Sequence, residues 1–130
     1  MIDLTKFQHY QHTKKVWGKE ILLTNPQNTF SPNQYCSKLM VVESGWQCSL
    51  HRHLVKDETF FILDGVVIIE TSLDGEKLSW DVFTAGDSIH IRPKVWHRFK
   101  ATNNPVLMLE VSTPHSDGDV ERMEESRRCD

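Results

Sequence analysis

The most informative stretch of the sequence reads Gly45-Trp-Gln-Cys-Ser-Leu-His51-Arg-His53-Leu-Val-Lys-Asp-Glu58-Thr-Phe-Phe-Ile-Leu-Asp-Gly65. In a β-strand, residues two apart point to the same face, so His51 and His53 should project together with their Cα atoms roughly 6 to 7 Å apart. Glu58 opens the next predicted strand and can return a carboxylate to that face. The stretch therefore indicates a metal site, although a His-x-His pair in a strand can also be a plain surface pair.

A further histidine extends this candidate site. His97 stands at the start of a later predicted strand, after Pro93. Three imidazoles and one carboxylate leave two positions for water or substrate, which suits one divalent ion of the Zn, Mn, Fe, Ni or Co type. The sequence does not decide which of these metals is bound.

The rest of the chain predicts short strands separated by turn residues, because its segments are rich in β-branched and aromatic residues or alternate in polarity. No long amphipathic helix lies between them, so we expect an all-β antiparallel barrel or sandwich rather than a βαβ sheet. Asp64-Gly65 and Asp74-Gly75 predict hairpin tips. The expected strands are 35–43, 47–53, 58–63, 66–72, 78–83, 87–92, 97–101 and 106–112, with 20–24 as a further candidate.

We expect a single domain with an N-terminal segment over residues 1–14, a barrel over 15–112 and a tail over 113–130. Residues 29–34 predict a loop before the main body. In the tail, acidic residues precede basic ones between 119 and 128, which matches a helix dipole. This order predicts a short C-terminal helix with Asp117 or Asp119 as its N-cap.

Composition narrows the function classes. A chain of 130 residues with 38% hydrophobic and 25% charged residues can bury a core but has no room for a separate cofactor domain. A net charge of -3 disfavours nucleic acid as a partner. Three cysteines without Cys-x-x-Cys spacing indicate reduced thiols. The N-terminus lacks the apolar region of a signal peptide and no window is long enough to span a bilayer, so we expect a cytoplasmic protein without membrane contact.

The residues Gly45, His51, His53, Glu58 and Gly65 follow the spacing of the first motif of the cupin superfamily, which the sequence therefore resembles. Gly86 and His97 match the second cupin motif in separation. The resemblance implies a double-stranded β-helix, or jelly-roll barrel, with the metal held by the three histidines and Glu58. Three positions of the second motif depart from the family pattern, where proline, glycine and asparagine are usual: Arg92, Lys94 and Ala101.

A finer resemblance runs from Lys15 to Arg128. Over this range the chain is similar to the cupin domain of type II mannose-6-phosphate isomerases and related sugar isomerases, although many of these have glutamine where this chain has His51. The resemblance implies an aldose-ketose isomerase of a sugar or sugar phosphate. It rests on Val16-Trp17-Gly18, Lys38, Lys56, His97-Arg98, Glu110-Val111 and Asp119-Val-Glu-Arg122.

An isomerase needs a general base besides the metal, and Glu110 and Lys56 are the candidates for it. The sequence does not decide whether Glu110 faces inward. Trp17 would line the pocket or pack in the core. Four cations are candidates for binding an anionic substrate group, with solvated turn or strand positions as the alternative: Lys38, Arg92, Lys94 and Arg98.

Two other functions remain open from the sequence. Three imidazoles with open coordination also support an Fe(II)-dependent dioxygenase, and a noncatalytic sugar-binding or sensing module with a structural metal is the third hypothesis. We also expect a homodimer, in which Phe7, Tyr10, Val16 and Trp17 would cover a neighbouring subunit.

Overall fold

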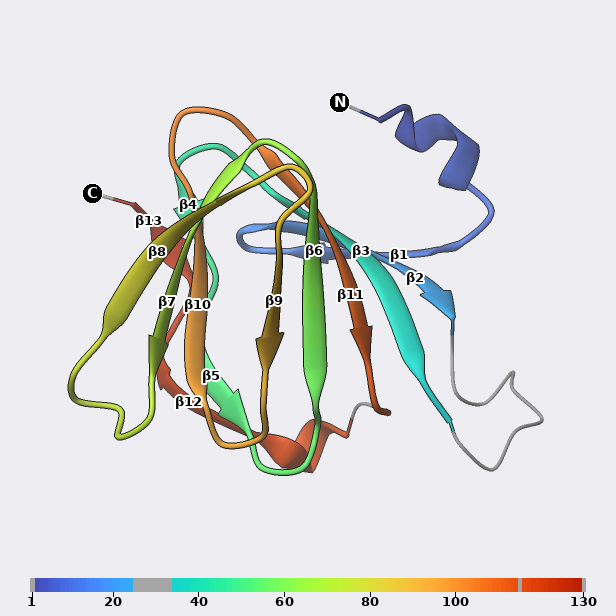
Figure 1. Cartoon of the computed structure of the whole chain (residues 1–130). Helices are drawn as coiled ribbons and strands as arrows, with labels where there is room; N and C mark the ends of the chain where they lie inside the picture. Colours follow the sequence, from blue (N-terminus) through green and yellow to red (C-terminus); the bar gives the residue numbers. More distant parts are fainter. Residues whose placement is uncertain (1, 25–33, 115, 130) are drawn as a thin grey trace.

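Two antiparallel β-sheets face each other in the structure, a computed structural model that describes residues 2–24, 34–114 and 116–129 (Figure 1). The first sheet has the order β1 (Gln11–Lys15), β2 (Gly18–Thr24), β3 (Cys36–Val42), β11 (Val106–Ser112), β6 (Glu58–Asp64) and β9 (Ser88–Ile91). The second joins β12 (Val120–Glu124), β5 (Leu50–His53), β10 (Trp96–Ala101), β4 (Trp46–Gln47) and β13 (Arg127–Arg128). On its other edge β10 pairs with β7 (Val66–Ser72), and β7 with β8 (Ser79–Thr84). The all-β jelly-roll prediction is confirmed.

The predicted strands recur with small shifts, except that 47–53 is divided into β4 and β5. One predicted turn has a different role. Asp74-Gly75 connects the paired strands β7 and β8, as predicted for a hairpin. Asp64-Gly65 does not form a hairpin tip, because β6 pairs with β9 and β11 while β7 pairs with β8 and β10. This dipeptide instead carries the chain from one sheet to the other. Gly65 has φ 93°, and a Cβ there would lie 2.7 Å from the carbonyl oxygen of Pro105, so the crossing needs glycine.

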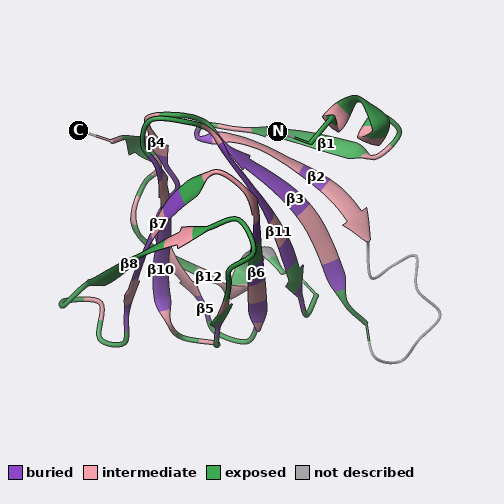
Figure 2. Cartoon of the chain, turned by 45° about the horizontal axis from the view of Figure 1, so that its top comes forward, coloured by how far each residue is buried: buried purple, intermediate pink, exposed green. Residues whose placement is uncertain are grey.

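The inward faces of the strands are apolar at one end of the barrel and polar at the other, and strand alternation separates them from a second cluster on the other face of the first sheet. Along β3, Met40 and Val42 face the core between the sheets, while Leu39 and Val41 belong to a second cluster. Buried residues gather on the central strands of both sheets (Figure 2). The core includes Phe60, Ile62, Val67, Ile69, Phe99, Val106 and Met108. At the other end of the same strands, the inward positions carry charged and imidazole side chains.

The N-terminal segment covers its own chain. Leu4 and Phe7, in the 3₁₀ helix η1 (Leu4–Phe7), pack with Tyr10 against the second cluster, which contains Ile21 and Leu107. The first sheet already begins at Gln11, inside the segment expected to precede the barrel. Most apolar side chains of the N-terminal segment therefore pack against their own chain. The homodimer stays a prediction.

The C-terminal helix prediction is wrong. After the short 3₁₀ helix η3 (Asp117–Asp119), the chain forms β12, which pairs with β5, and then β13, which pairs with β4. The charge order suits a helix dipole, but pairing with the open edge of β5 outweighs this weak local preference. Asp119 caps no α-helix. Of the loop predicted over residues 29–34, only Gln34 lies within the described residues. Within the described part of the chain, no helix is long and apolar enough to cross a membrane.

Candidate metal centre

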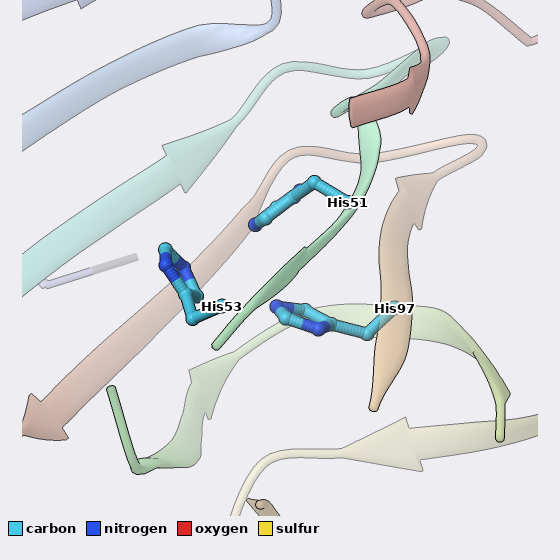
Figure 3. Close-up of side chains that lie close together, drawn as sticks. All are labelled: His51, His53 and His97. Carbon is cyan, nitrogen blue, oxygen red and sulfur yellow. The ribbon is translucent and has the colours of Figure 1, made fainter. Parts of the chain in front are cut away.

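Three histidines from two neighbouring strands converge at the polar end of the barrel. β5 supplies His51 and His53, and β10 supplies His97, whose Cα is the cross-strand partner of the Cα of His51. One ring nitrogen from each histidine lies within 4.8 Å of the others. Figure 3 shows the three rings turned toward a common space. The two-residue spacing and the strand register together produce this cluster, as the sequence predicts.

Backbone contacts fix the tautomers of two rings. Nδ1 of His51 lies 2.9 Å from the carbonyl oxygen of Ser49, and Nδ1 of His97 lies 3.0 Å from that of Val95. A carbonyl oxygen only accepts, so each Nδ1 carries the proton and donates it. The Nε2 lone pairs are then available to a metal ion, which is the usual arrangement of metal-binding histidines.

Glu58 lies against the same nitrogens. Its Oε1 is 3.4 Å from Nε2 of His53, and its Oε2 is 3.2 Å from Nε2 of His97. Among the described residues, Glu58 Oε2 and His97 Nε2 are buried without a hydrogen-bond partner. Because Nε2 of His97 carries a lone pair, two electron-rich atoms face each other there, and a cation between them would satisfy both. The four residues fit a divalent metal ion.

Burial keeps the imidazoles ready to bind a metal. It lowers the pKa of His51 to about 3 and that of His53 to about 4. Burial alone would raise the pKa of Glu58, but the positive charge against it, that of Lys56 at 3.3 Å, favours the carboxylate and holds that pKa below its ordinary range. Near pH 7 the rings of His51 and His53 are therefore neutral and lie beside a carboxylate.

The depressed pKa values of His51 and His53 predict a pH dependence for the metal-free protein. In the unfolded chain these histidines take up protons near pH 6.5, whereas in the folded chain they stay neutral down to about pH 4. Folding stability should therefore fall as the pH drops from 6.5 to 5, by up to about 1.4 kcal/mol per pH unit for each histidine. Urea unfolding at several pH values measures this slope. His51→Gln should reduce the slope, and an unchanged slope in that variant would contradict the assignment.

The cluster opens into a cavity of about 480 Å³ between the sheets. Besides the metal ligands, the sequence predicts seven residues for the substrate pocket. Four of them line this cavity: Trp17, Lys38, Lys56 and Glu110. The lining residues are Gln11, Thr13, Lys15, Trp17, Glu20, Lys38, Met40, Cys48, Ser49, His51, His53, Lys56, Glu58, Phe99, Glu110, Val120 and Arg122.

A chain of alternating charges crosses the cavity wall. Nζ of the buried Lys56 lies 3.3 Å from Oε1 of Glu58 and 3.0 Å from Oε2 of Glu110. Oε2 of Glu110 is 3.9 Å from Nζ of Lys38, which is 3.2 Å from Oε2 of Glu20. Glu110 therefore faces inward, which the sequence leaves undecided. Glu20 is a cavity residue that the sequence does not single out. The signal for it is its place next to the apolar Ile21 in the candidate strand 20–24, since neighbouring residues of a strand face opposite sides.

Three of the predicted anion-binding residues lie outside the cavity, and these placements correct the expectation. Arg98 follows His97 in β10 and therefore points to the opposite face, where its guanidinium contacts Glu70 at 2.6 Å and Glu124 at 3.2 Å. Arg92 and Lys94 are exposed in the turn before β10. Lys94 has φ 70°, a conformation that favours glycine, which explains why cupins usually have glycine at this position.

Trp17 and Arg122 also line the cavity. Trp17 is buried in the apolar core and also lines the cavity, so both interpretations of this residue apply. Arg122 lines the cavity from β12, beside His51 in the strand register. The sequence does not predict Arg122 as a cavity residue, because it predicts a helix for the tail. Only a strand places Val120 and Arg122 on one face.

Known proteins share this architecture. The sequence profile described as "Cupin domain" matches residues 38–112. A protein described as uncharacterized from Methanocaldococcus jannaschii is 34% identical over 86 residues, which are 65% of either chain. The fold is similar to oxalate decarboxylase from Bacillus subtilis, at 18% identity and a TM-score of 0.77 over 90% of this chain and 31% of that one. It is also similar to the capsular polysaccharide assembling protein CapF from Staphylococcus aureus, at 12% identity and a TM-score of 0.76 over 88% of this chain and 34% of that one.

A further structure of the Bacillus subtilis decarboxylase, described with Mn(II) centres, gives 18% identity and a TM-score of 0.73 over 87% of this chain and 30% of that one. This chain therefore spans about a third of the length of the solved structures that it matches. Likenesses at this level of identity show the fold alone. The profile, by contrast, covers more than half of the chain and includes all four predicted metal ligands. The protein belongs to the cupin family.

Proposed function

We propose that the protein is a metal-dependent enzyme that moves a proton within a small, oxygen-rich, anionic substrate, as an aldose-ketose isomerase of a sugar or sugar phosphate does. The observation that carries this proposal is the buried pair of Lys56 and Glu110 beside the histidines. Both side chains are at most 3% exposed, and their charged atoms lie 3.0 Å apart. Buried acid-base pairs in a polar cavity next to a metal site are typical of catalytic centres.

The contacts support a different role for the metal ligands, for Glu110 and for Lys56. A divalent ion held by the histidines and Glu58 would polarise a substrate carbonyl, which makes the neighbouring C–H bond more acidic. Glu110 can accept that proton on a carboxylate oxygen and return it to the adjacent carbon, so no other reactant is consumed. Lys56 holds Glu110 in place and, as the second candidate base from the sequence, is the alternative proton carrier. Ser112 donates a further hydrogen bond to Oε2 of Glu110 at 3.1 Å.

The charge of the cavity favours an anionic substrate. Four cationic side chains (Lys15, Lys38, Lys56 and Arg122) line it against three carboxylates (Glu20, Glu58 and Glu110). The wall is thus positive before a metal ion is counted, whereas the chain as a whole has a net charge of -3. In the described part of the chain each of these lysines pairs with a glutamate, but Arg122 forms no ion pair. A guanidinium in this position suits a phosphate or carboxylate group of the substrate.

Isotope exchange tests the proposed reaction. The metal-loaded protein is incubated in D₂O with a panel of aldoses, ketoses and their phosphates, and deuterium at the carbon next to the carbonyl is followed by NMR. We expect deuterium incorporation and isomer formation with an anionic sugar, and neither in the metal-free protein. Oxygen consumption without deuterium incorporation would contradict the isomerase and support the dioxygenase. Binding without turnover would support the sugar-binding module.

A further inference from the structure

The short connection between two metal ligands is held by the C-terminal segment. Residues 54–57 link His53 to Glu58, and every backbone N–H of this connection donates to residues 113–119. The N–H groups of Leu54, Val55 and Lys56 donate to the carboxylate of Asp119, and that of Asp57 donates to Oγ1 of Thr113. In return, the N–H of Thr113 donates to the carbonyl of Asp57 at 3.1 Å.

The Asp119 carboxylate uses both oxygens in this contact. Oδ1 accepts from Leu54 at 3.0 Å and from Val55 at 2.8 Å, and Oδ2 accepts from Lys56 at 2.9 Å. Oδ2 also lies 3.9 Å from Nδ1 of His53, close enough to attract a proton on that nitrogen. The Asp119 side chain is only 10% exposed, and its contact with Lys56 is partly buried, whereas those with Leu54 and Val55 lie at the surface.

We propose that Asp119 is the positioning residue of the metal centre: by binding the connection between His53 and Glu58 it fixes the distance between these two ligands and turns Lys56 toward Glu110. The inference rests on the metal centre of the proposed function. Without the carboxylate, the N–H groups of Val55 and Lys56 lose their acceptor, while that of Leu54 keeps only the backbone carbonyl of Asp119 at 3.1 Å. The connection then gains conformations in which His53 and Glu58 do not point at one ion. Metal binding must then restrict that freedom again, which weakens the affinity.

The chain offers a matched control for this residue. Asp74, in the turn between β7 and β8, accepts the N–H groups of Glu76 and Lys77 at 2.9 and 3.0 Å and the hydroxyl of Ser72 at 3.0 Å. Its carboxylate thus stabilises a loop in the same way, but it does not line the cavity of the metal centre. Asp74→Ala therefore removes a comparable loop-capping carboxylate and leaves the connection between His53 and Glu58 intact.

The test is the affinity of the full chain for Zn²⁺ or Mn²⁺, measured by competition with a chelator well below the unfolding temperature. We expect Asp119→Ala to weaken the affinity about 10- to 100-fold, the usual effect of losing a group that orients metal ligands. Asp119→Asn should lie between it and the wild type, because an amide oxygen keeps the two Oδ1 contacts but its NH₂ group cannot accept from Lys56. Asp74→Ala should keep the wild-type affinity.

Hydrogen exchange on the metal-free protein supplies a second readout. The amides of Val55 and Lys56 should exchange faster in Asp119→Ala than in the wild type, and that of Lys56 also in Asp119→Asn, whereas Asp74→Ala should leave both unchanged. Wild-type metal affinity in both Asp119 variants, or an equal loss in Asp74→Ala, would overturn the positioning role. A wild-type protein that binds metal but shows no isomerisation would contradict the proposed function alone.

Discussion

Replacing His53 with alanine is expected to lower the metal affinity of the protein by about 10²-fold or more. The loss of a group that only orients a ligand costs 10- to 100-fold, so removal of a direct ligand should reach at least the upper end of that range. Both ring nitrogens of His53 lie near a carboxylate: Nε2 is 3.4 Å from Glu58, and Nδ1 is 3.9 Å from Asp119. Chelator competition and elemental analysis of the dialysed protein measure the effect.

His90 provides the control for this substitution. It lies on β9, is 48% exposed and contacts Asp57 at 2.6 Å, so it is a histidine near the site that does not line the cavity. His90→Ala should retain its metal through dialysis. An equal loss in both variants would indicate a general effect on folding, and full occupancy in His53→Ala would exclude His53 as a ligand.

Replacing Glu110 with glutamine is expected to reduce kcat by about 10²-fold or more on the sugar or sugar phosphate that shows deuterium exchange, because glutamine keeps the size of the side chain but accepts no proton. The variant should still fold, since Lys56 keeps its contact with Glu58 at 3.3 Å. Steady-state kinetics and the rate of deuterium exchange measure the effect, and both should fall together if Glu110 removes the proton.

Glu20→Gln is the control for Glu110→Gln. Glu20 also lines the cavity and also contacts Lys38, but it has no contact with Lys56 in the described structure. Its substitution should change KM more than kcat, the pattern expected when binding rather than chemistry is affected. An unchanged kcat in Glu110→Gln would contradict its role as the base and assign the proton transfer to Lys56.

Part of the ligand set was within reach of the sequence because the pair of His51 and His53 depends on spacing alone. Its completion by His97 depends on the register of β5 with β10, which the sequence indicates only through the cupin resemblance. His51 and His53 are two residues apart in a strand, and any strand places them on one face. The order of short strands and turns likewise determined the fold class. The same period of two places Arg98 on the face opposite His97, outside the cavity. The resemblance to sugar isomerases predicted the opposite, and here strand alternation was the better guide.

The remaining errors come from interactions between distant parts of the chain. The segment 119–128 has the charges of a helix, but its pairing with β5 depends on a strand edge some 70 residues earlier, which local propensity does not describe. Asp64-Gly65 has the composition of a hairpin tip, and only the sheet topology shows that it joins two sheets. The roles of Asp119 and Arg122 follow from the same long-range pairing.

Anomalous diffraction from crystals of the metal-loaded protein can locate the metal ion that we expect between His51, His53, His97 and Glu58. With data collected on both sides of the absorption edge of the bound metal, we expect one anomalous peak per chain, within bonding distance of Nε2 of all three histidines and of a Glu58 oxygen. A metal-loaded crystal with no peak there, or with its peak at surface residues, would contradict a metal centre formed by these four residues.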